Sequence, residues 1–375
     1  MSTIDFLAGA AAGLAQLQPY DPGLDAIEVR RRWGVAEVFE LSGNESIWGP
    51  SPTVAAALSE AATRLPYYPD PSARELKSEL ARLHGLRPEQ FVVGNGSHEL
   101  LVQIACTLVQ VGQRVVAPRH GFAVFAIAGI QSGGHLQLVP VHPLDHPRAL
   151  NAEADSMADA AAGARLVFIA NPNNPTGGGW NAVELQSFLE RVPAQTLVVI
   201  DEAYAEYVLG EDWVSALTLL DQYPNLIVTR TFSKAYGLAS LRIGYAACSA
   251  HLAALLERTR LTFNLNHCAQ AAAVAALRDR EHLDSVVAQT LAQRPLWADA
   301  LSALGLRVFP SEGNFLLVDF GRPAQPIFEA MAARGVLLRP VTGYGLPNCL
   351  RITIADQRSL DALVAGLSSV LAELP

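Results

Sequence analysis

Residues Thr231–Gly244 read Thr-Phe-Ser-Lys-Ala-Tyr-Gly-Leu-Ala-Ser-Leu-Arg-Ile-Gly, and the interpretation of the chain starts from the lysine within them. Lysine occurs only twice among the 27 basic residues, at Lys77 and Lys234. A chain this rich in arginine keeps lysine where a guanidinium cannot replace it, because only a primary amine forms a Schiff base. Ser233 and Arg242 add a hydroxyl and a guanidinium that both bind phosphate well. The stretch therefore predicts a reactive amine beside an anion site.

Short β-rich runs alternate with helical stretches on both sides of this segment. The expected strands are Phe91–Val93, Arg114–Ala117, Leu136–Val139, Leu166–Ala170, Leu197–Ile200, Leu226–Thr229 and Arg242–Ala247. Helices are expected between several of them, at His98–Val109, Phe122–Gln131 and Asn181–Glu190. Such alternation is typical of a mostly parallel sheet that is covered by helices on both faces.

The pattern changes after about residue 290, where a helix at Leu291–Leu304 is followed by strands that are not regularly separated by helices. We therefore expect an α/β protein, with a large domain built on a mostly parallel central sheet and a smaller α+β domain. The predicted division is an N-terminal arm that joins the small domain (1–45), a large domain (46–285) and a small C-terminal domain (286–375).

Charge and composition exclude several classes of function. The formal net charge is -9, and the longest run of basic residues is Arg30–Arg32, so nucleic acid is not an expected partner. The four cysteines form no C-x-x-C pair, and we expect free thiols in a cytoplasmic protein without a metal site. No basic residue precedes the apolar stretch Phe6–Leu14, and no apolar run reaches the roughly 18 residues of a membrane span, so neither a signal peptide nor a membrane segment is expected.

Polar residues follow two further predicted strands. Asp201 comes directly after Leu197–Ile200, where a carboxylate could hold a heteroaromatic nitrogen protonated or cap the next segment. Tyr204 lies three residues further on and could donate to a ring oxygen. Asn171–Gly177 reads Asn-Pro-Asn-Asn-Pro-Thr-Gly, a rigid turn in which Asn174 could present its amide to the same ligand.

A glycine-rich turn, Gly94–Ser97, lies between the strand at 91–93 and the helix that follows. Small residues before a helix leave backbone N–H groups free for a phosphate. Together the four strand ends provide a primary amine, an acid, an amide donor and a phosphate site. These are the groups that pyridoxal 5'-phosphate requires.

The order of these motifs resembles that of fold-type I pyridoxal-phosphate aminotransferases, and most closely that of the histidinol-phosphate aminotransferase family. The resemblance extends from Leu17–Gly23 to Tyr344–Ile354, which is nearly the whole chain. It implies that Lys234 forms the internal aldimine and moves a proton. It implies that Asp201 pairs with the pyridine nitrogen. The implied contacts are Asn174 and Tyr204 with the phenolic oxygen, and Gly96, Ser97, Ser233 and Arg242 with the phosphate.

The resemblance also implies a homodimer and a substrate pocket. Tyr68 matches a tyrosine that reaches the phosphate from the neighbouring subunit. Arg351 matches the arginine that binds the substrate carboxylate, and Tyr20, Asn44 and Arg339 are further candidates for substrate contacts. Arg339 could bind a substrate phosphate or lie exposed at a strand end.

The implied reaction converts L-histidinol phosphate and 2-oxoglutarate to imidazole-acetol phosphate and L-glutamate, a ping-pong step of histidine biosynthesis. An aromatic amino-acid aminotransferase and an amino-acid-phosphate decarboxylase are alternatives with the same lysine. A ligand-sensing module of a regulator is a third, but the first 40 residues show no basic helix-turn-helix.

The chain departs from the family in two places. Asn44–Pro50 reads Asn-Glu-Ser-Ile-Trp-Gly-Pro where the family usually has Asn-Glu-Asn-Pro, an aromatic residue and glycine. His120 stands where an aromatic ring usually stacks on the cofactor, with Phe122 as the substitute candidate. We expect the first departure to affect substrate choice.

Overall fold

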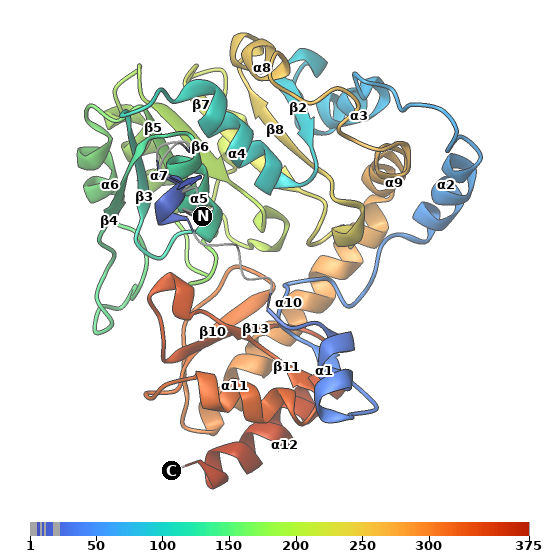
Figure 1. Ribbon diagram of the computed structural model, residues 1–375, viewed down its shortest axis with the longest axis vertical. Coiled ribbons are helices and arrows are strands. Elements are labelled where there is room, and N and C mark those ends of the chain that lie inside the picture. Colours follow the sequence, from blue (N-terminus) through green and yellow to red (C-terminus); the bar gives the residue numbers. More distant parts are fainter. Residues whose placement is uncertain (1–5, 8–9, 11–12, 18–22, 375) are drawn as a thin grey trace, which may run out of the picture.

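The computed structural model describes residues 6–7, 10, 13–17 and 23–374. Within these residues the largest sheet has seven strands in the order β2-β8-β7-β6-β5-β3-β4 (Figure 1). They are β2 (Phe91–Gly94), β3 (Arg114–Pro118), β4 (His135–Val139), β5 (Leu166–Ala170), β6 (Leu197–Asp201), β7 (Leu226–Thr231) and β8 (Gly244–Cys248). Only the pairs that include β8 are antiparallel. The predicted α/β fold with a mostly parallel sheet is confirmed.

The two faces of this sheet belong to different hydrophobic clusters, as the alternation along β5 shows. Leu166 and Phe168 pack with α4 (Ser97–Leu108), α5 (Ala123–Gln131) and α8 (Ala250–Glu257). Val167 and Ile169 pack on the other face with α3 (Arg74–His84), α6 (Ala154–Ala161), α7 (Ala182–Arg191) and α9 (His267–Arg278). Because both faces are buried, the strands read as continuous apolar runs rather than alternating ones.

One predicted strand begins later than expected. The sequence predicted a strand at Arg242–Ala247, whereas β8 begins at Gly244. Arg242 has a φ of 54° and ends the short 3-10 helix Ala239–Leu241. A residue in the left-handed region cannot continue an extended strand, so the backbone turns at Arg242 before it enters the sheet.

The C-terminal part of the chain forms a second, antiparallel sheet in the order β12-β13-β10-β9. Its strands are β9 (Arg307–Val308), β10 (Phe315–Asp319), β12 (Arg339–Pro340) and β13 (Cys349–Thr353), and its helices are α11 (Gln325–Ala332) and α12 (Gln357–Glu373). The helix predicted at Leu291–Leu304 is the second half of a longer helix, α10 (Arg280–Ala303), which links the two parts of the molecule (Figure 1). No helix within the described residues is long and apolar enough to span a bilayer.

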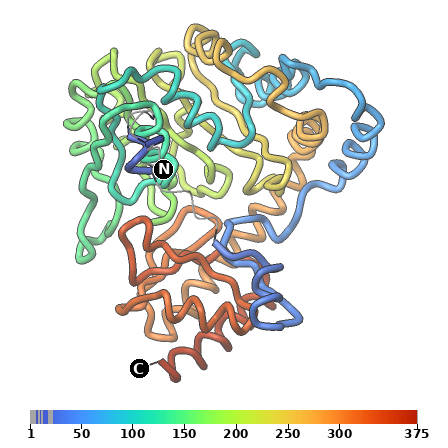
Figure 2. Tube along the Cα trace, in the orientation of Figure 1, coloured from blue at the N-terminus to red at the C-terminus, as the bar shows by residue number. Residues whose placement is uncertain are grey.

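The N-terminal segment packs against this C-terminal part (Figure 2). α1 (Ala26–Trp33) contributes Val29 to the core of the smaller sheet. β1 (Phe39–Glu40) pairs in parallel with β11 (Val336–Leu337), and α2 (Pro52–Ala62) then packs against α9. The domain boundaries predicted at 45/46 and 285/286 stay predictions, and the second falls within α10.

A substitution of Phe168 tests the packing of the large sheet. Its side chain is fully buried and stacks on Phe125 with ring centroids 5.0 Å apart. We expect Phe168→Ala to lower the free energy of unfolding by about 3–5 kcal/mol, because it removes a buried ring and leaves a cavity. Urea denaturation measures the change, with Ile27→Ala at an exposed position as the control. A loss as small as that of the control would show that the stacked pair does not stabilise the sheet.

Candidate functional site

Three adjacent parallel strands end at the same edge of the large sheet. The register pairs Ala170 of β5 with Asp201 of β6, and Asp201 with Thr229 of β7. The segments that follow these strands therefore meet at one edge, where open α/β sheets bind their ligands.

A cavity of about 570 Å³ opens at this edge. Its wall combines the ends of the large sheet, the segment around Ser42 and Gly43, and the smaller sheet. The predicted site residues that line it are Ser97, Asn174, Asp201, Tyr204, Ser233, Lys234, Arg242, Arg339 and Arg351. Residues separated by up to about 250 positions in sequence are thus brought to one cavity.

Lys234 lies in the cavity wall with a perturbed amine. Its Nζ donates a hydrogen bond to the carbonyl oxygen of Gly43 at 2.9 Å. Burial lowers the pKa of Lys234 to about 8, and the nearby guanidinium of Arg351 contributes to the fall. Much of this amine is therefore neutral near pH 8, the form that acts as a nucleophile or base.

Asp201 ends β6 with a buried carboxyl group. The hydroxyl of Thr229 on the neighbouring strand donates to its Oδ1 at 2.9 Å. Burial raises the pKa of Asp201 to about 7, and the Thr229 hydrogen bond opposes this rise. A cationic N–H placed against the carboxyl would favour its charged form, so Asp201 is suited to hold a protonated ring nitrogen.

Tyr204 presents a protonated phenol to the same cavity. Its side chain is buried, and burial raises its pKa well above the usual value. The side-chain amide of Asn44 donates to the Tyr204 hydroxyl at 2.9 Å. The phenol is thereby held in one place and stays neutral.

Arg351 provides a buried cation opposite Lys234. Its Nη1 donates to Oδ1 of Asn174 at 2.7 Å, and its Nη2 donates to the carbonyl oxygen of Ser42. Its Nε, in contrast, is buried without a hydrogen-bond partner among the described residues. A buried guanidinium with an unused donor favours an anionic ligand.

The N-terminus of α4 forms the opposite end of the cavity. Gly96 precedes the helix with a φ of 83° and has no side chain to cap it, so it leaves the first N–H groups of the helix uncapped. Arg242 lies against this turn, and its Nη1 donates to the Ser233 hydroxyl at 3.3 Å. A Cβ on Gly96 would come within 2.5 Å of the Arg242 guanidinium. Only glycine leaves room for this arrangement of donors, which suits a phosphate.

Other predicted site residues lie outside the cavity wall. His120 is buried, and its Nδ1 donates to the carbonyl oxygen of Tyr344 at 2.7 Å, whereas Phe122 lines the cavity. Tyr68 is exposed and stacks on Phe263. Asn44 is fully buried behind Tyr204. Tyr20 lies outside the described residues. Their predicted contacts with cofactor or substrate stay predictions.

Thr229 and the carbonyl group of Gly43 are parts of this site that were not predicted from the sequence. The available signal was that Thr229 directly follows the apolar residues Leu226–Val228 in an expected strand, because a polar side chain in a buried strand needs a partner. A backbone carbonyl gives no signal in the sequence at all.

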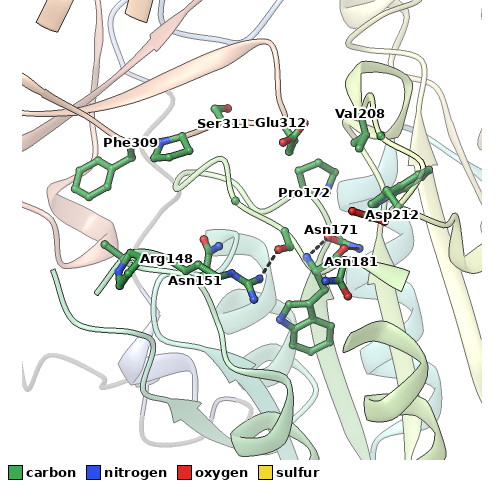
Figure 3. Close-up of a pocket in the computed structure, with 18 of the residues that line it drawn as sticks. Arg148, Asn151, Asn171, Pro172, Asn181, Val208, Asp212, Phe309, Ser311 and Glu312 are labelled. Carbon is green, nitrogen blue, oxygen red and sulfur yellow. Dashed lines mark hydrogen bonds between the residues drawn. The ribbon is translucent and has the colours of Figure 1, made fainter. Parts of the chain in front are cut away.

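A second cavity, of about 460 Å³, lies between the loop at Arg148–Asn151 and the segment Phe309–Glu312 (Figure 3). The guanidinium of Arg148 already donates to the carboxylate of Glu184 and to the carbonyl oxygen of Gly179. Neither lysine of the chain lines this cavity. We therefore assign the functional site to the cavity that contains Lys234.

Known proteins resemble this chain over nearly its whole length. The sequence pattern of the family described as "Aminotransferase class I and II" matches residues 36–367. A histidinol-phosphate aminotransferase of Anaeromyxobacter sp. is 42% identical, over 96% of this chain and 98% of its own. Histidinol-phosphate aminotransferase 2 of Pseudomonas fluorescens Pf-5 is 43% identical, over 98% and 99%. The structure of histidinol-phosphate aminotransferase from Sinorhizobium meliloti in complex with pyridoxal-5'-phosphate superposes with a TM-score of 0.87, at 33% identity over 96% and 97% of the two chains.

The acidity of Lys234 can be measured directly, because the chain has only one other lysine. Competitive acetylation of the ligand-free protein, followed by peptide mass spectrometry, reports each amine separately. We expect labelling of Lys234 to rise with pH around a midpoint of about 8, since only the neutral amine reacts. Arg351→Met should move this midpoint to higher pH, because it removes a cation that opposes protonation.

Lys77 lies outside the cavity in an ion pair with Glu257 at 2.7 Å and serves as the internal reference for reagent reactivity. A Lys234 midpoint at the ordinary lysine value of about 10.4, unmoved by Arg351→Met, would show that this site does not perturb its amine.

Proposed function

The chain belongs to the class I and II aminotransferase family, as its sequence resemblance predicted, and from this membership we propose that it is a pyridoxal-5'-phosphate-dependent histidinol-phosphate aminotransferase. The reaction would convert L-histidinol phosphate and 2-oxoglutarate to imidazole-acetol phosphate and L-glutamate. The observation that carries the proposal is that Lys234, Asp201 and Arg351 line one cavity in a chain over 40% identical to enzymes of that name.

The residues of the cavity fit pyridoxal 5'-phosphate. Gly96 leaves an open turn at the N-terminus of α4, and the Arg242 guanidinium beside it offers charge for the phosphate. Asp201 would hold the pyridine nitrogen, and Asn174 and Tyr204 would contact the phenolic oxygen. Ser97 and Ser233 would complete the phosphate contacts. Each group of the cofactor thus has a partner of suitable chemistry in the cavity.

Lys234, Asp201 and Tyr204 would have different roles in transamination. When bound, the cofactor supplies an aldehyde that joins to amines and a ring that withdraws electrons. The neutral Nζ of Lys234 would hold the cofactor through this aldehyde and, when not so engaged, would accept the proton from Cα of the amino substrate. Asp201 would hold the ring nitrogen protonated, and Tyr204 would stay neutral and donate a hydrogen bond.

Two arginines would select the substrates. Arg351 would bind the carboxylate of glutamate or 2-oxoglutarate through its unused Nε and its Nη atoms. Arg339 of β12 lines the same cavity and would bind the phosphate of histidinol phosphate. The two amino donors would then share one site but depend on different cations.

We further propose that the protein is a homodimer and works in the cytoplasm. Tyr68 and Phe263 stack, and Leu65, Tyr67 and Leu261 nearby in sequence are also exposed, which gives these two segments apolar groups that a second copy could cover. In such a dimer Tyr68 would reach the phosphate of the neighbouring site. The four free cysteines suit a reducing compartment.

Single-turnover absorbance distinguishes the candidate substrates. Holoenzyme is mixed separately with L-histidinol phosphate, glutamate and phenylalanine, and loss of the visible cofactor band is followed. We expect histidinol phosphate and glutamate to remove the band rapidly and phenylalanine to act more slowly. Arg339→Leu should slow the response to histidinol phosphate by about 10- to 100-fold and leave that to glutamate nearly unchanged, because it removes one charged hydrogen-bond donor.

Lys234→Ala is the control in this experiment, because it removes the amine that holds the cofactor and should abolish the response to every donor. A faster response to phenylalanine would instead identify an aromatic amino-acid aminotransferase. If no donor changes the band, transamination of these substrates is wrong, and release of carbon dioxide from amino-acid phosphates becomes the next assay.

Mixed dimers test the contribution of Tyr68. Tyr68→Ala and Lys234→Ala should each be nearly inactive alone, because one removes the phosphate contact and the other the reactive amine. Random exchange of subunits should restore about a quarter of the wild-type activity, because half of the dimers then contain one complete site. Exchange is verified with two affinity tags, and exchange without any recovery would show that each site is built from a single chain.

A further inference from the structure

The hydrogen bond between Asn44 and Tyr204 has a defined direction. Nδ2 of Asn44 lies 2.9 Å from the Tyr204 hydroxyl oxygen. An amide nitrogen only donates, so the phenol oxygen accepts in this bond and its own hydrogen is not used there. Because Tyr204 lines the cavity that contains Lys234, this hydrogen is available to a ligand bound in it.

The direction holds only while the Asn44 amide keeps its orientation. A side-chain amide turned by half a rotation would present Oδ1 to the phenol and take up its hydrogen. What prevents this rotation is Thr353, the last residue of β13. The backbone N–H of Asn44 donates to Oγ1 of Thr353 at 2.9 Å, and the Thr353 hydroxyl donates to Oδ1 of Asn44 at 3.2 Å.

These two bonds fix the orientation of the Asn44 amide, because the backbone N–H and the Thr353 hydroxyl each have one hydrogen to donate. A backbone N–H can only donate, so it occupies a lone pair of the Thr353 oxygen and leaves the hydroxyl hydrogen for an acceptor. In the observed orientation, Oδ1 of Asn44 is that acceptor. In the turned orientation Nδ2 would face the hydroxyl, and the Thr353 hydrogen would lose its partner inside a buried site.

The backbone of Asn44, like its side chain, is held by hydrogen bonds. Asn44 is fully buried, with a φ of 56°, a left-handed conformation that asparagine tolerates better than most residues. Nδ2 of Asn314 donates to its carbonyl oxygen at 3.0 Å. The peptide groups before and after Asn44 are thus each held by one hydrogen bond, to Thr353 and to Asn314 respectively.

We propose that Asn44 and Thr353 are positioning residues that set the direction of the Tyr204 hydrogen bond, so that Tyr204 donates to the phenolic oxygen of the bound cofactor. This inference rests on the proposed function for the identity of the cofactor. A hydrogen bond donated to that oxygen reduces the negative charge that retains the titrating proton of the bound cofactor. The pH midpoint of its visible absorbance change is therefore lower than it would be without the donor.

Absorbance titration of purified holoenzyme variants measures this effect independently of turnover. Tyr204→Phe removes the donor and defines the full upward shift of the midpoint. Asn44→Asp keeps the shape of the side chain but offers only acceptors, so it should draw the Tyr204 hydrogen away and raise the midpoint by about one pH unit. The same substitution added to Tyr204→Phe should cause little further shift, because its effect passes through the missing hydroxyl.

Substitutions of Thr353 test the same positioning role without introducing a charge. Thr353→Val keeps the branched shape and removes the hydroxyl, so it should raise the midpoint in the same direction by a smaller amount. Thr353→Ser retains the hydroxyl and should stay close to wild type. This matched pair keeps the inference testable if Asn44→Asp does not fold.

The outcomes separate the inference from the proposed function. A wild-type protein without a pH-dependent visible band after addition of pyridoxal 5'-phosphate would contradict the proposed function. A normal wild-type band, a shift with Tyr204→Phe and none with Asn44→Asp or Thr353→Val would overturn only the positioning role. An equal shift from Asn44→Asp with and without the Tyr204 hydroxyl would also overturn it, because a direct charge effect would then explain the change.

Discussion

The parallel order of β5, β6 and β7 is the constraint on which the site depends. Because the three strands run in the same direction and in register, the segments after them meet at one edge. Asp201 is the last residue of β6, and Lys234 follows the end of β7 by three residues. Each is therefore close to the end of its strand, and both line the same cavity. The hydrophobic faces on both sides of the sheet hold this edge in place.

The electrostatics of the cavity follow from the charged side chains that lie at this edge of the sheet. The chain carries a net charge of -9, yet Lys234, Arg242, Arg339 and Arg351 all line one cavity. Such a group of cations repels itself, and part of that repulsion appears as the lowered pKa of Lys234. Anionic groups of a ligand would relieve the repulsion. The same charges therefore favour phosphate and carboxylate ligands and keep the amine reactive.

The large sheet and most of the cavity wall could be predicted, because apolar β-rich runs followed by polar residues mark strands that end at a site. The start of β8 could not, since no glycine or other local signal in the sequence marks the left-handed conformation of Arg242. Nor could the hydrogen bond of Asn44 with Thr353, 309 positions away, be predicted. A contact over that separation leaves no periodic or local pattern in a single sequence.

The segment Ser42–Asn44 explains why both parts of the molecule are needed for one site. It accepts hydrogen bonds from Lys234 through Gly43 and from Arg351 through Ser42, and its Asn44 bonds to Tyr204 and Thr353. Tyr204 and Lys234 follow β6 and β7 of the large sheet, whereas Arg351 and Thr353 belong to β13 of the smaller one. A three-residue segment thus connects the amine and the guanidinium through two neighbouring carbonyl groups. Any movement of the smaller sheet would be transmitted through these bonds to both the charge and the hydrogen bonding of the reactive groups.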